Sequence, residues 1–364
     1  MKSFASDNYA GAHPAIIEAV ASVNTGHMPS YGEDSYTESA YEALRKQFGA
    51  DTHARLLYNG TSANILCLSA LMQAWDGVIA TKMSHINTDE CGAPERIAGI
   101  KVISVDSDNG KLSVEAVAPL IEHLQGFEHT RQPKVISISN VAELGTLYSP
   151  AETRALADYA HSKGMYLHVD GARIANAAAA QGVSLAALTS EAGVDALSLG
   201  GTKNGMMYGD AALWFGKAAE SVQSSSFMLC KASAMLGSKL RFLAAQFSAM
   251  YEGDLWLHCA MRANAMAQRL ADGLPESCER AFVDDCSEGN LANEVFAWLP
   301  KEIVEPLQEK FHFYTWEKGP SVPLEDSDKF CSPYAGKDCV RWVTSWDTTE
   351  EDVDALLAAI CEAV

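Results

Sequence analysis

The stretch VDALSLGGTKNG, residues 194–205, contains a predicted buried strand that leads directly to a lysine. Residues 194–200 are mostly apolar, as strands are when helices cover both faces of a sheet. Lys203 follows between glycines and an asparagine, which indicate a loop. A lone lysine is usually a solvated surface charge, whereas a lysine activated by its site can form a Schiff base with a carbonyl compound. The choice between the two depends on the residues that reach the same end of the sheet.

Similar apolar runs alternate with helical patterns over most of the first two thirds of the chain. This alternation predicts an α/β fold, with a mostly parallel sheet of about seven strands flanked by helices. The strands are predicted at residues 54–59, 77–82, 101–106, 134–140, 165–171, 194–200 and 211–216. Helices are predicted at residues 113–125 and 149–164, each of which begins with a serine suited to an N-cap, and one long helix at residues 218–270.

The pattern changes after about residue 255 and predicts a smaller α+β domain. Its segments are NEVFAWLP (293–300), KFHFYTW (310–316), CVRWVTSW (339–346) and a closing helix at 349–363. A length of 364 residues suits one large domain and a smaller one. We therefore predict a large domain over residues 1–250, including an N-terminal arm, and a small C-terminal domain over residues 251–364.

The composition restricts the partners and the compartment. A formal net charge of -20 repels nucleic acid and anionic membranes, so neither is expected as a partner. The nine cysteines are scattered and form no Cys-x-x-Cys pair, which argues against a disulfide framework or a metal site and favours a reducing compartment, the cytoplasm. No secretory signal and no apolar run long enough to span a membrane are found.

Four polar features are predicted at the carboxyl ends of strands, where open α/β sheets bind their ligands. Gly60 and Thr61 open an apolar helix, whose free N–H groups favour an anion such as phosphate, although an ordinary N-cap explains the same residues. Asp170 closes a strand and Arg173 follows it, which a structural ion pair also explains. His85 follows another strand, where histidines are commonly structural. Lys203 is the fourth.

Together these features match the requirements of pyridoxal phosphate. This cofactor needs an anion site for its phosphate, a lysine for its aldehyde, and an acid opposite its ring nitrogen. The acid keeps the pyridine protonated, so that the ring can accept electrons from a carbanion.

With these motifs the chain resembles the low-specificity threonine aldolases, which belong to the β-eliminating lyase group and have the aspartate-aminotransferase fold (fold type I). The resemblance covers nearly the whole chain, from residue 5 to residue 354. Its motifs are SYGED (30–34), NGTSAN (59–64), SHINTDECGAPE (84–95), HVDGARIANA (168–177), SLGGTKNG (198–205) and VRWVTSWD (340–347). Thr202 and Asn204 flank the lysine where many members have serine and glycine, which blurs the stereochemical preference.

The resemblance implies cofactor-binding roles within the large domain. Lys203 would hold pyridoxal phosphate covalently, and Asp170 would pair with the pyridinium nitrogen. Gly60 and Thr61 would bind the phosphate. His85 would stack on the ring and help with proton transfer.

The resemblance also implies substrate-binding roles. Ser6, Arg173 and Arg341 would bind the substrate carboxylate, and Arg173 would also contribute to the cofactor site. His129 falls where the family often has a second histidine near the substrate hydroxyl. The base that removes the hydroxyl proton stays open between His85, His129 and an ordered water.

The implied reaction is the cleavage of L-threonine, L-allo-threonine or a related β-hydroxy-α-amino acid to glycine and an aldehyde. β-Elimination or transamination on the same scaffold is the first alternative, and a pyridoxal-phosphate-binding protein without turnover is the second. A homo-oligomer is expected, a dimer or a tetramer, with the active site at a subunit interface. Lys239 or Arg241 could reach a neighbour's phosphate, although an exposed basic helix face explains both residues equally well.

Overall fold

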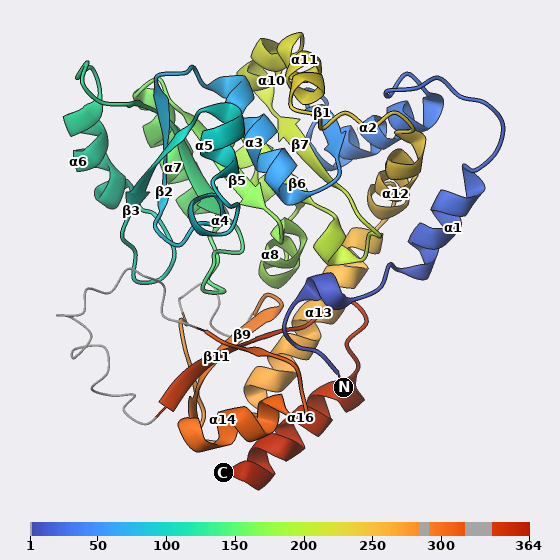
Figure 1. Cartoon of the computed structure of the whole chain (residues 1–364), viewed down its shortest axis with the longest axis vertical. Helices are drawn as coiled ribbons and strands as arrows, with labels where there is room; N and C mark the ends of the chain where they lie inside the picture. Colours follow the sequence, from blue (N-terminus) through green and yellow to red (C-terminus); the bar gives the residue numbers. More distant parts are fainter. Residues whose placement is uncertain (1, 284–290, 317–336) are drawn as a thin grey trace.

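The computed structural model describes residues 2–283, 291–316 and 337–364. Its larger part is built on a seven-stranded sheet in the order β1-β7-β6-β5-β4-β2-β3 (Figure 1). The strands are β1 (His53–Leu57), β2 (Asp76–Thr81), β3 (Lys101–Val105), β4 (Gln132–Ser139), β5 (Tyr166–Gly171), β6 (Ala196–Gly200) and β7 (Asp210–Trp214). Only β7 runs antiparallel to its neighbours, β1 and β6. The predicted mostly parallel sheet of seven strands is confirmed.

Helices cover both faces of this sheet (Figure 1). In the first half of the chain they are α1 (Pro14–Ser22), α2 (Ser35–Phe48), α3 (Gly60–Leu71), α4 (His85–Thr88), α5 (Ala93–Ala98) and α6 (Val114–Leu124). They continue with α7 (Pro150–Ser162), α8 (Ile174–Gln181), α9 (Leu185–Leu188), α10 (Gly216–Val222), α11 (Ser225–Ala232), α12 (Arg241–Tyr251) and α13 (Leu255–Asp272). Short 3-10 turns lie at Asp7–Tyr9, Ser190–Ala192 and Thr202–Asn204. The predicted caps are confirmed for α6, where Ser113 accepts the Ala116 N–H, and for α7, which Ser149 begins with a capping box.

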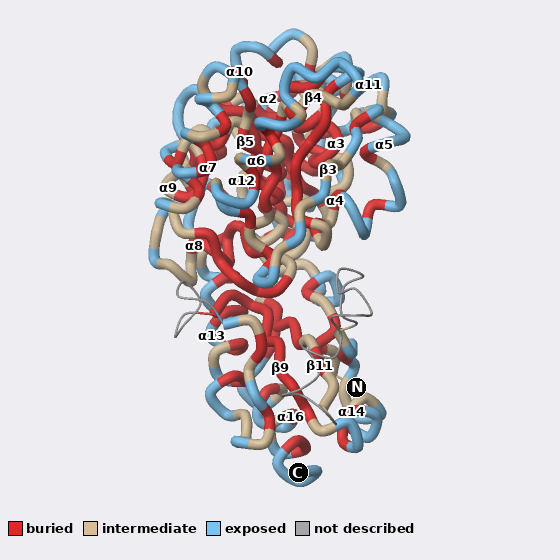
Figure 2. Tube along the Cα trace, turned by 90° about the vertical axis from the view of Figure 1, so that its left-hand side faces the viewer, coloured by how far each residue is buried: buried red, intermediate tan, exposed pale blue. Residues whose placement is uncertain are grey.

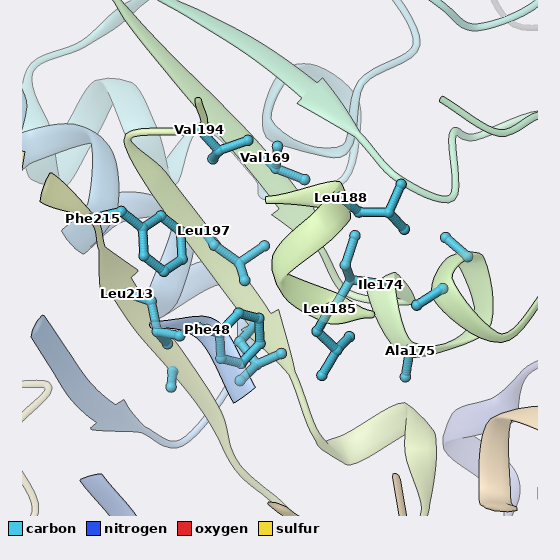
Figure 3. Packing of buried hydrophobic residues seen from close by; sticks show 14 of the residues in the cluster. Phe48, Val169, Ile174, Ala175, Leu185, Leu188, Val194, Leu197, Leu213 and Phe215 are labelled. Carbon is cyan, nitrogen blue, oxygen red and sulfur yellow. The ribbon is translucent and has the colours of Figure 1, made fainter. Parts of the chain in front are cut away.

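Alternate residues of the central strands enter two different cores, because successive strand side chains point to opposite faces. Leu197 and Leu213 face the core that contains α2, α8 and α9 (Figure 3). Their neighbours Ala196 and Trp214 face the core formed with α3. The continuous apolar runs in the sequence therefore reflect burial on both sides.

The prediction of one long helix over residues 218–270 is wrong, because four helices, α10 to α13, cover this stretch. The largest break lies between α11 and α12, where Ala234 has a positive φ of 59° and Gly237 packs directly against Tyr58. A Cβ at Gly237 would overlap the Tyr58 hydroxyl. The apolar periodicity continues across these turns and so conceals them.

A four-stranded antiparallel sheet in the order β10-β11-β9-β8 forms the smaller part. Its elements are β8 (Glu279–Arg280), β9 (Glu294–Pro300), α14 (Lys301–Gln308), β10 (Tyr314–Thr315), β11 (Lys337–Val343) and α16 (Glu350–Ala363). Helix α13 joins the two parts, and each part has its own buried interior (Figure 2). Trp256 of α13 belongs to the large core and Leu270 to the small one.

The N-terminal arm packs on the small core. Phe4 is fully buried there, and its carbonyl accepts the Val343 N–H at 2.7 Å. The division of the chain at 250/251 stays a prediction. Within the described ranges, we find no helix that is both long and apolar enough to cross a membrane.

Candidate functional site

The candidate lysine follows the central strand β6. It lies where the parallel strands have their carboxyl ends, which we call the carboxyl edge of the sheet; the opposite ends form its amino edge. Lys203 lies in the 3-10 turn Thr202–Asn204, and the Asp210 carboxylate anchors this turn by accepting the Gly201 N–H at 2.9 Å. A Cβ at Gly200 would come within 2.7 Å of the Ala172 Cα, so only glycine allows the two loops to pass this closely. The glycines that precede the lysine are therefore required by packing.

The Lys203 amine lies in a positive and partly desolvated environment. The nearby Arg173 charge and burial together lower its pKa below the ordinary value for lysine, against the opposing effect of Asp7 and Asp170. Within the described ranges the Lys203 amine makes no hydrogen bond and no ion pair. An unpartnered amine whose charge is disfavoured suits covalent chemistry with a carbonyl.

Asp170 lies on the neighbouring strand β5, buried but held as an anion. Its Oδ2 accepts a hydrogen bond from Asn64 Nδ2 at 2.8 Å, and its Oδ1 accepts the Ala172 N–H at 3.1 Å. Burial alone would raise the pKa of this carboxyl, but the His85 charge and the Asn64 hydrogen bond outweigh it, and the pKa is lowered. A buried carboxylate stabilised in this way can keep a ring nitrogen protonated.

His85 begins α4 after strand β2 and is bonded to a buried acid. Its Nδ1 lies 3.0 Å from Glu90 Oε1, which also accepts Asn64 Nδ2 at 2.7 Å. The Glu90 hydrogen bond raises the pKa of His85 despite partial burial, and the Asp170 charge acts in the same direction. Ligand atoms of His85, Glu90 and Asp170 all lie within 4.8 Å of one another. Glu90 Oε1 thus joins His85 and Asn64 in one hydrogen-bonded group.

The predicted anion site lies at the start of helix α3. Asn59 caps this helix by accepting the Ser62 N–H at 2.9 Å, which leaves the N–H groups of Gly60 and Thr61 outside the helical pattern. The space beside Gly60 is open, since a Cβ there would meet nothing within 4 Å. One turn further along, Asn64 bonds Asp170. A single helix thus fixes the distance between the anion site and the acid.

The predicted carboxylate-binding residues lie together where the N-terminal arm meets the small domain. Arg173 forms a two-pronged bond to the buried Asp7, from Nε at 2.7 Å and from Nη2 at 3.1 Å. Arg341 is held loosely, with Nη2 3.4 Å from the Ala5 carbonyl and Nη1 3.8 Å from Glu294. Ser6 lies between these two contacts in the chain.

Arg173 has fewer donors available for a ligand than Arg341, because it is paired with the carboxylate of Asp7. Burial would raise the pKa of Asp7, but the Arg173 charge outweighs burial, and the pKa of Asp7 is lowered. Asn293 Nδ2 donates to the same carboxylate at 2.9 Å. Arg173 is thus already committed to an anion of its own chain.

The structure does not bring His129 to this group of residues. It precedes strand β4 and therefore lies at the amino edge of the sheet. Its side chain is 74% exposed, 3.7 Å from Glu128 Oε1 and edge-on to Phe127. The resemblance implies a place near the substrate hydroxyl, but β4 runs away from His129 toward Asp170.

Sequence reasoning missed several polar residues that the fold brings to the carboxyl edge: Asp7, Asn64, Glu90, Glu143 and Glu294. Asn64 and Glu90 fall inside two quoted motifs, NGTSAN and SHINTDECGAPE, and these motifs were the available signal. Glu143 follows strand β4 and accepts hydrogen bonds from Ser139 Oγ at 2.6 Å and from the His85 N–H at 3.1 Å.

The donor set fits pyridoxal phosphate. It combines an open helix N-terminus, a buried carboxylate one turn away, an unpartnered lysine on the adjacent strand and a flat ring at His85. These are the contacts that the cofactor's phosphate, ring nitrogen, aldehyde and ring face require.

Comparison with known proteins agrees with this donor set. The family model of the β-eliminating lyases matches residues 3–284. The low specificity L-threonine aldolase of Pseudomonas aeruginosa is 36% identical over 362 residues, which cover 98% of this chain and 96% of the relative. A Leishmania major threonine aldolase structure covers 100% of this chain and 99% of its own, with a TM-score of 0.87 and 28% identity. A structure of SPT with PLP, 18% identical with a TM-score of 0.70, shares the fold type I architecture.

Proposed function

Because the chain belongs to the β-eliminating lyase family of pyridoxal-phosphate enzymes, we propose that it is an aldolase that cleaves β-hydroxy-α-amino acids, L-threonine and L-allo-threonine among them, to glycine and an aldehyde. The observation that carries the proposal is the convergence of Lys203, Asp170 and the α3 N-terminus at one edge of the sheet. A full-length relative that is named for this activity supports the substrate class.

When bound, pyridoxal phosphate supplies an electron sink for the bond that breaks at the substrate Cα. Asp170 keeps a proton on the ring nitrogen, because the buried carboxylate stabilises the positive charge beside it. That stabilisation matters most when electrons move toward the ring, so it lowers the barrier rather than only tightening binding.

Lys203 would hold the cofactor covalently through its side-chain amine. Its lowered pKa makes the neutral, nucleophilic amine accessible at a smaller cost than in solution. Gly60 and Thr61 would donate their N–H groups to the cofactor phosphate. His85 would lie on the ring face, oriented by the contact of its Nδ1 with Glu90 at 3.0 Å.

Arg341 binds the substrate carboxylate, supported by Ser6. Its planar fork can bond both carboxylate oxygens, and its present contacts are long. Arg173 positions the arm segment through Asp7, and Arg341 contacts the same segment at the Ala5 carbonyl. The catalytic and positioning roles of these residues rest on their mutual contacts and on the family motifs.

We also propose a cytoplasmic homo-oligomer, a dimer or a homotetramer, whose active site lies near a subunit interface. Support comes from two exposed apolar side chains, Tyr58, which precedes α3, and Met207, each 44% exposed; the neighbouring Tyr208 ring lies 6.0 Å from the Tyr58 ring. Lys239 is exposed, whereas Arg241 is held within its own chain by the Thr25 carbonyl at 3.3 Å. Lys239 is therefore the better candidate for a neighbour's phosphate. Sedimentation equilibrium tests the assembly.

Product identification tests the proposed activity. The purified holoenzyme is incubated separately with L-threonine, L-allo-threonine and β-phenylserine, and the products are identified by mass spectrometry. We expect glycine and the matching aldehyde in equal amounts. Pyruvate or another keto acid would instead indicate β-elimination or transamination. The absence of any product would indicate a pyridoxal-phosphate-binding protein without turnover.

A further inference from the structure

We propose that Glu143 is the base that takes the β-hydroxyl proton of the substrate. The inference rests on the proposed aldolase function and adds the residue that the reaction still lacks. Its starting point is the position of Glu143 in the loop that follows β4, whose last residue lies beside Asp170. Ser139 pairs with Asp170 in the sheet register, and the Asn140 N–H donates to the Asp170 carbonyl at 3.0 Å.

The Glu143 carboxyl has one oxygen engaged and one available. Oε1 accepts hydrogen bonds from Ser139 Oγ at 2.6 Å and from the His85 N–H at 3.1 Å. Oε2 makes no hydrogen bond within the described parts of the chain, and it is not among the buried atoms without a partner. Two donors therefore orient the group while its second oxygen stays able to receive a proton.

The loop that carries Glu143 is held at both ends. Two hydrogen bonds between Asn140 and Tyr148 close the loop. Asn140 Nδ2 donates to the Tyr148 carbonyl at 3.0 Å, and the Tyr148 N–H donates to Asn140 Oδ1 at 3.2 Å. Gly145, at a φ of +77°, packs against Phe296 of the small domain, where a Cβ would lie 3.3 Å from the ring. A base held this firmly needs little reorganisation before the proton moves.

The other acids at this edge are already engaged. Asp170 serves the ring nitrogen, and Glu90 is bonded to His85 and Asn64. Asp7 is bonded to Arg173. Glu294 lies close to two arginines, Arg173 at 3.6 Å and Arg341 at 3.8 Å.

The two histidines first considered are less available than Glu143. His85 Nδ1 is bonded to Glu90 Oε1 at 3.0 Å, and His129 lies at the opposite edge of the sheet. Burial raises the pKa of Glu143 to about 7, with the Asp170 charge acting in the same direction and the Ser139 hydrogen bond opposing it. A base with a pKa near the working pH combines a useful ionised fraction with a strong affinity for the proton.

The step balances without a further reactant. The Glu143 carboxylate takes the proton from the β-hydroxyl oxygen, and the electrons of that O–H bond form the C=O of the aldehyde. The Cα–Cβ bond breaks, and its electron pair stays with the glycine portion until Cα receives a proton. Glu143 is then a neutral acid, which returns its proton to solvent.

The decisive variant is Glu143→Gln, which keeps an acceptor for Ser139 and His85 but cannot take a proton. We expect kcat for L-allo-threonine cleavage to fall by about 100-fold or more. The visible absorbance of bound cofactor and the exchange of the glycine α-proton with deuterium, followed by NMR, should stay within about threefold, because neither involves a hydroxyl group. Glu128→Gln, the same change at a 78% exposed glutamate, is the control and should leave kcat unchanged.

The pH dependence gives a second test. For the wild type, kcat should rise as the pH increases through the Glu143 pKa near 7, because the ionised form is the active one. The groups that face Glu143 are Asp170, His85 and the Tyr148 phenol, and none of them is altered in Glu143→Gln. The rise should therefore disappear in this variant. Infrared difference spectra of the apoenzyme between about pH 6 and about pH 8 should show a protonated carboxyl band that Glu143→Gln lacks.

Two outcomes overturn the inference: a Glu143→Gln enzyme with the wild-type kcat, or one that loses α-proton exchange as completely as cleavage. If Glu143→Gln fails to fold, Glu143→Asp replaces it and should keep the rise with pH at a reduced kcat; a flat profile would overturn the inference. A wild type that releases no glycine would refute the proposed function instead.

Discussion

The seven-stranded sheet has a histidine bonded to a carboxylate at each end of its parallel strands, but the surroundings of the two pairs differ. At the carboxyl edge, His85 and Glu90 lie beside the unpartnered Lys203 amine and the open start of α3. At the amino edge, His161 Nε2 lies 2.9 Å from Asp195 Oδ2, beside a cavity of about 900 Å³. None of the predicted site residues lines that cavity.

The comparison favours polar groups without hydrogen-bond partners, rather than the volume of a cavity, as the indication of an active site. Asp195 is satisfied by the Leu167 N–H at 2.8 Å as well as by His161. The lysines that line the cavity, Lys46 and Lys217, are exposed. Both groups of this pair are satisfied by each other or by the backbone, whereas in the described parts of the chain the Lys203 amine and the N–H groups of Gly60 and Thr61 have no partner.

Replacing Lys203 should reduce the activity more than any other change at either edge of the sheet. Lys203→Ala removes the only amine proposed to bind the cofactor covalently. We expect kcat to fall by at least about 1,000-fold, together with the visible absorbance of the bound cofactor. Absorbance spectra and the glycine assay measure both. Normal colour and turnover in this variant would show that the carboxyl edge is not the site.

Asp170→Asn should have the next largest effect. The amide has nearly the same size, but it cannot hold the ring nitrogen protonated. We expect the cofactor to bind while the barrier to cleavage rises by about 2–4 kcal/mol, the range found when a preorganised stabilising group is deleted. Steady-state kinetics with L-allo-threonine measure this loss, and an unchanged kcat would refute the proposed pairing.

Arg341→Lys tests the substrate side of the carboxyl edge. Lysine keeps the charge but loses the planar fork that can bond both carboxylate oxygens. KM for the amino acid should rise about tenfold, equivalent to about 1.4 kcal/mol, while cofactor absorbance stays normal. If KM keeps the wild-type value, Ser6 or Arg173 must bind the carboxylate, and Arg173 would first have to leave Asp7.

Asp195→Asn should have the smallest effect and is the matched control for Asp170→Asn. It weakens a contact to His161, whose side chain is 44% exposed. Burial raises the pKa of Asp195, so the wild type loses stability as the pH rises through that pKa, and the neutral amide avoids this loss. We expect kcat to stay within about twofold and the free energy of unfolding to change by less than about 1 kcal/mol. A large loss of activity would indicate that the reaction takes place at the amino edge.

The sequence predicts the sheet better than it predicts the site. Each predicted strand exists, because runs such as residues 134–140 and 194–200 are buried on both faces and so are apolar throughout. The long helix predicted over 218–270 is wrong, because the same apolar period continues through turns at Gly237 and Gly253. Local pattern does not record where one helix stops and another begins.

Lys203 and Asp170 could be predicted at the carboxyl edge because each lies close to the end of a recognisable strand, Asp170 within β5 and Lys203 in the turn after β6. Glu143 could not, because an acid in a loop looks like a surface residue until distant strands bring its partners close, whereas the only signal for Asn64 was its motif NGTSAN. His129 shows the converse, since a residue close in sequence to a strand of the site can lie at that strand's far end.

The most direct test of the account is to find which lysine bears the cofactor. The holoenzyme is reduced with borohydride and digested, and the cofactor-bearing peptide is identified by mass spectrometry. The account predicts that the label is on Lys203, at the carboxyl edge. A label on Lys46 or Lys217, which line the cavity at the amino edge, would contradict it.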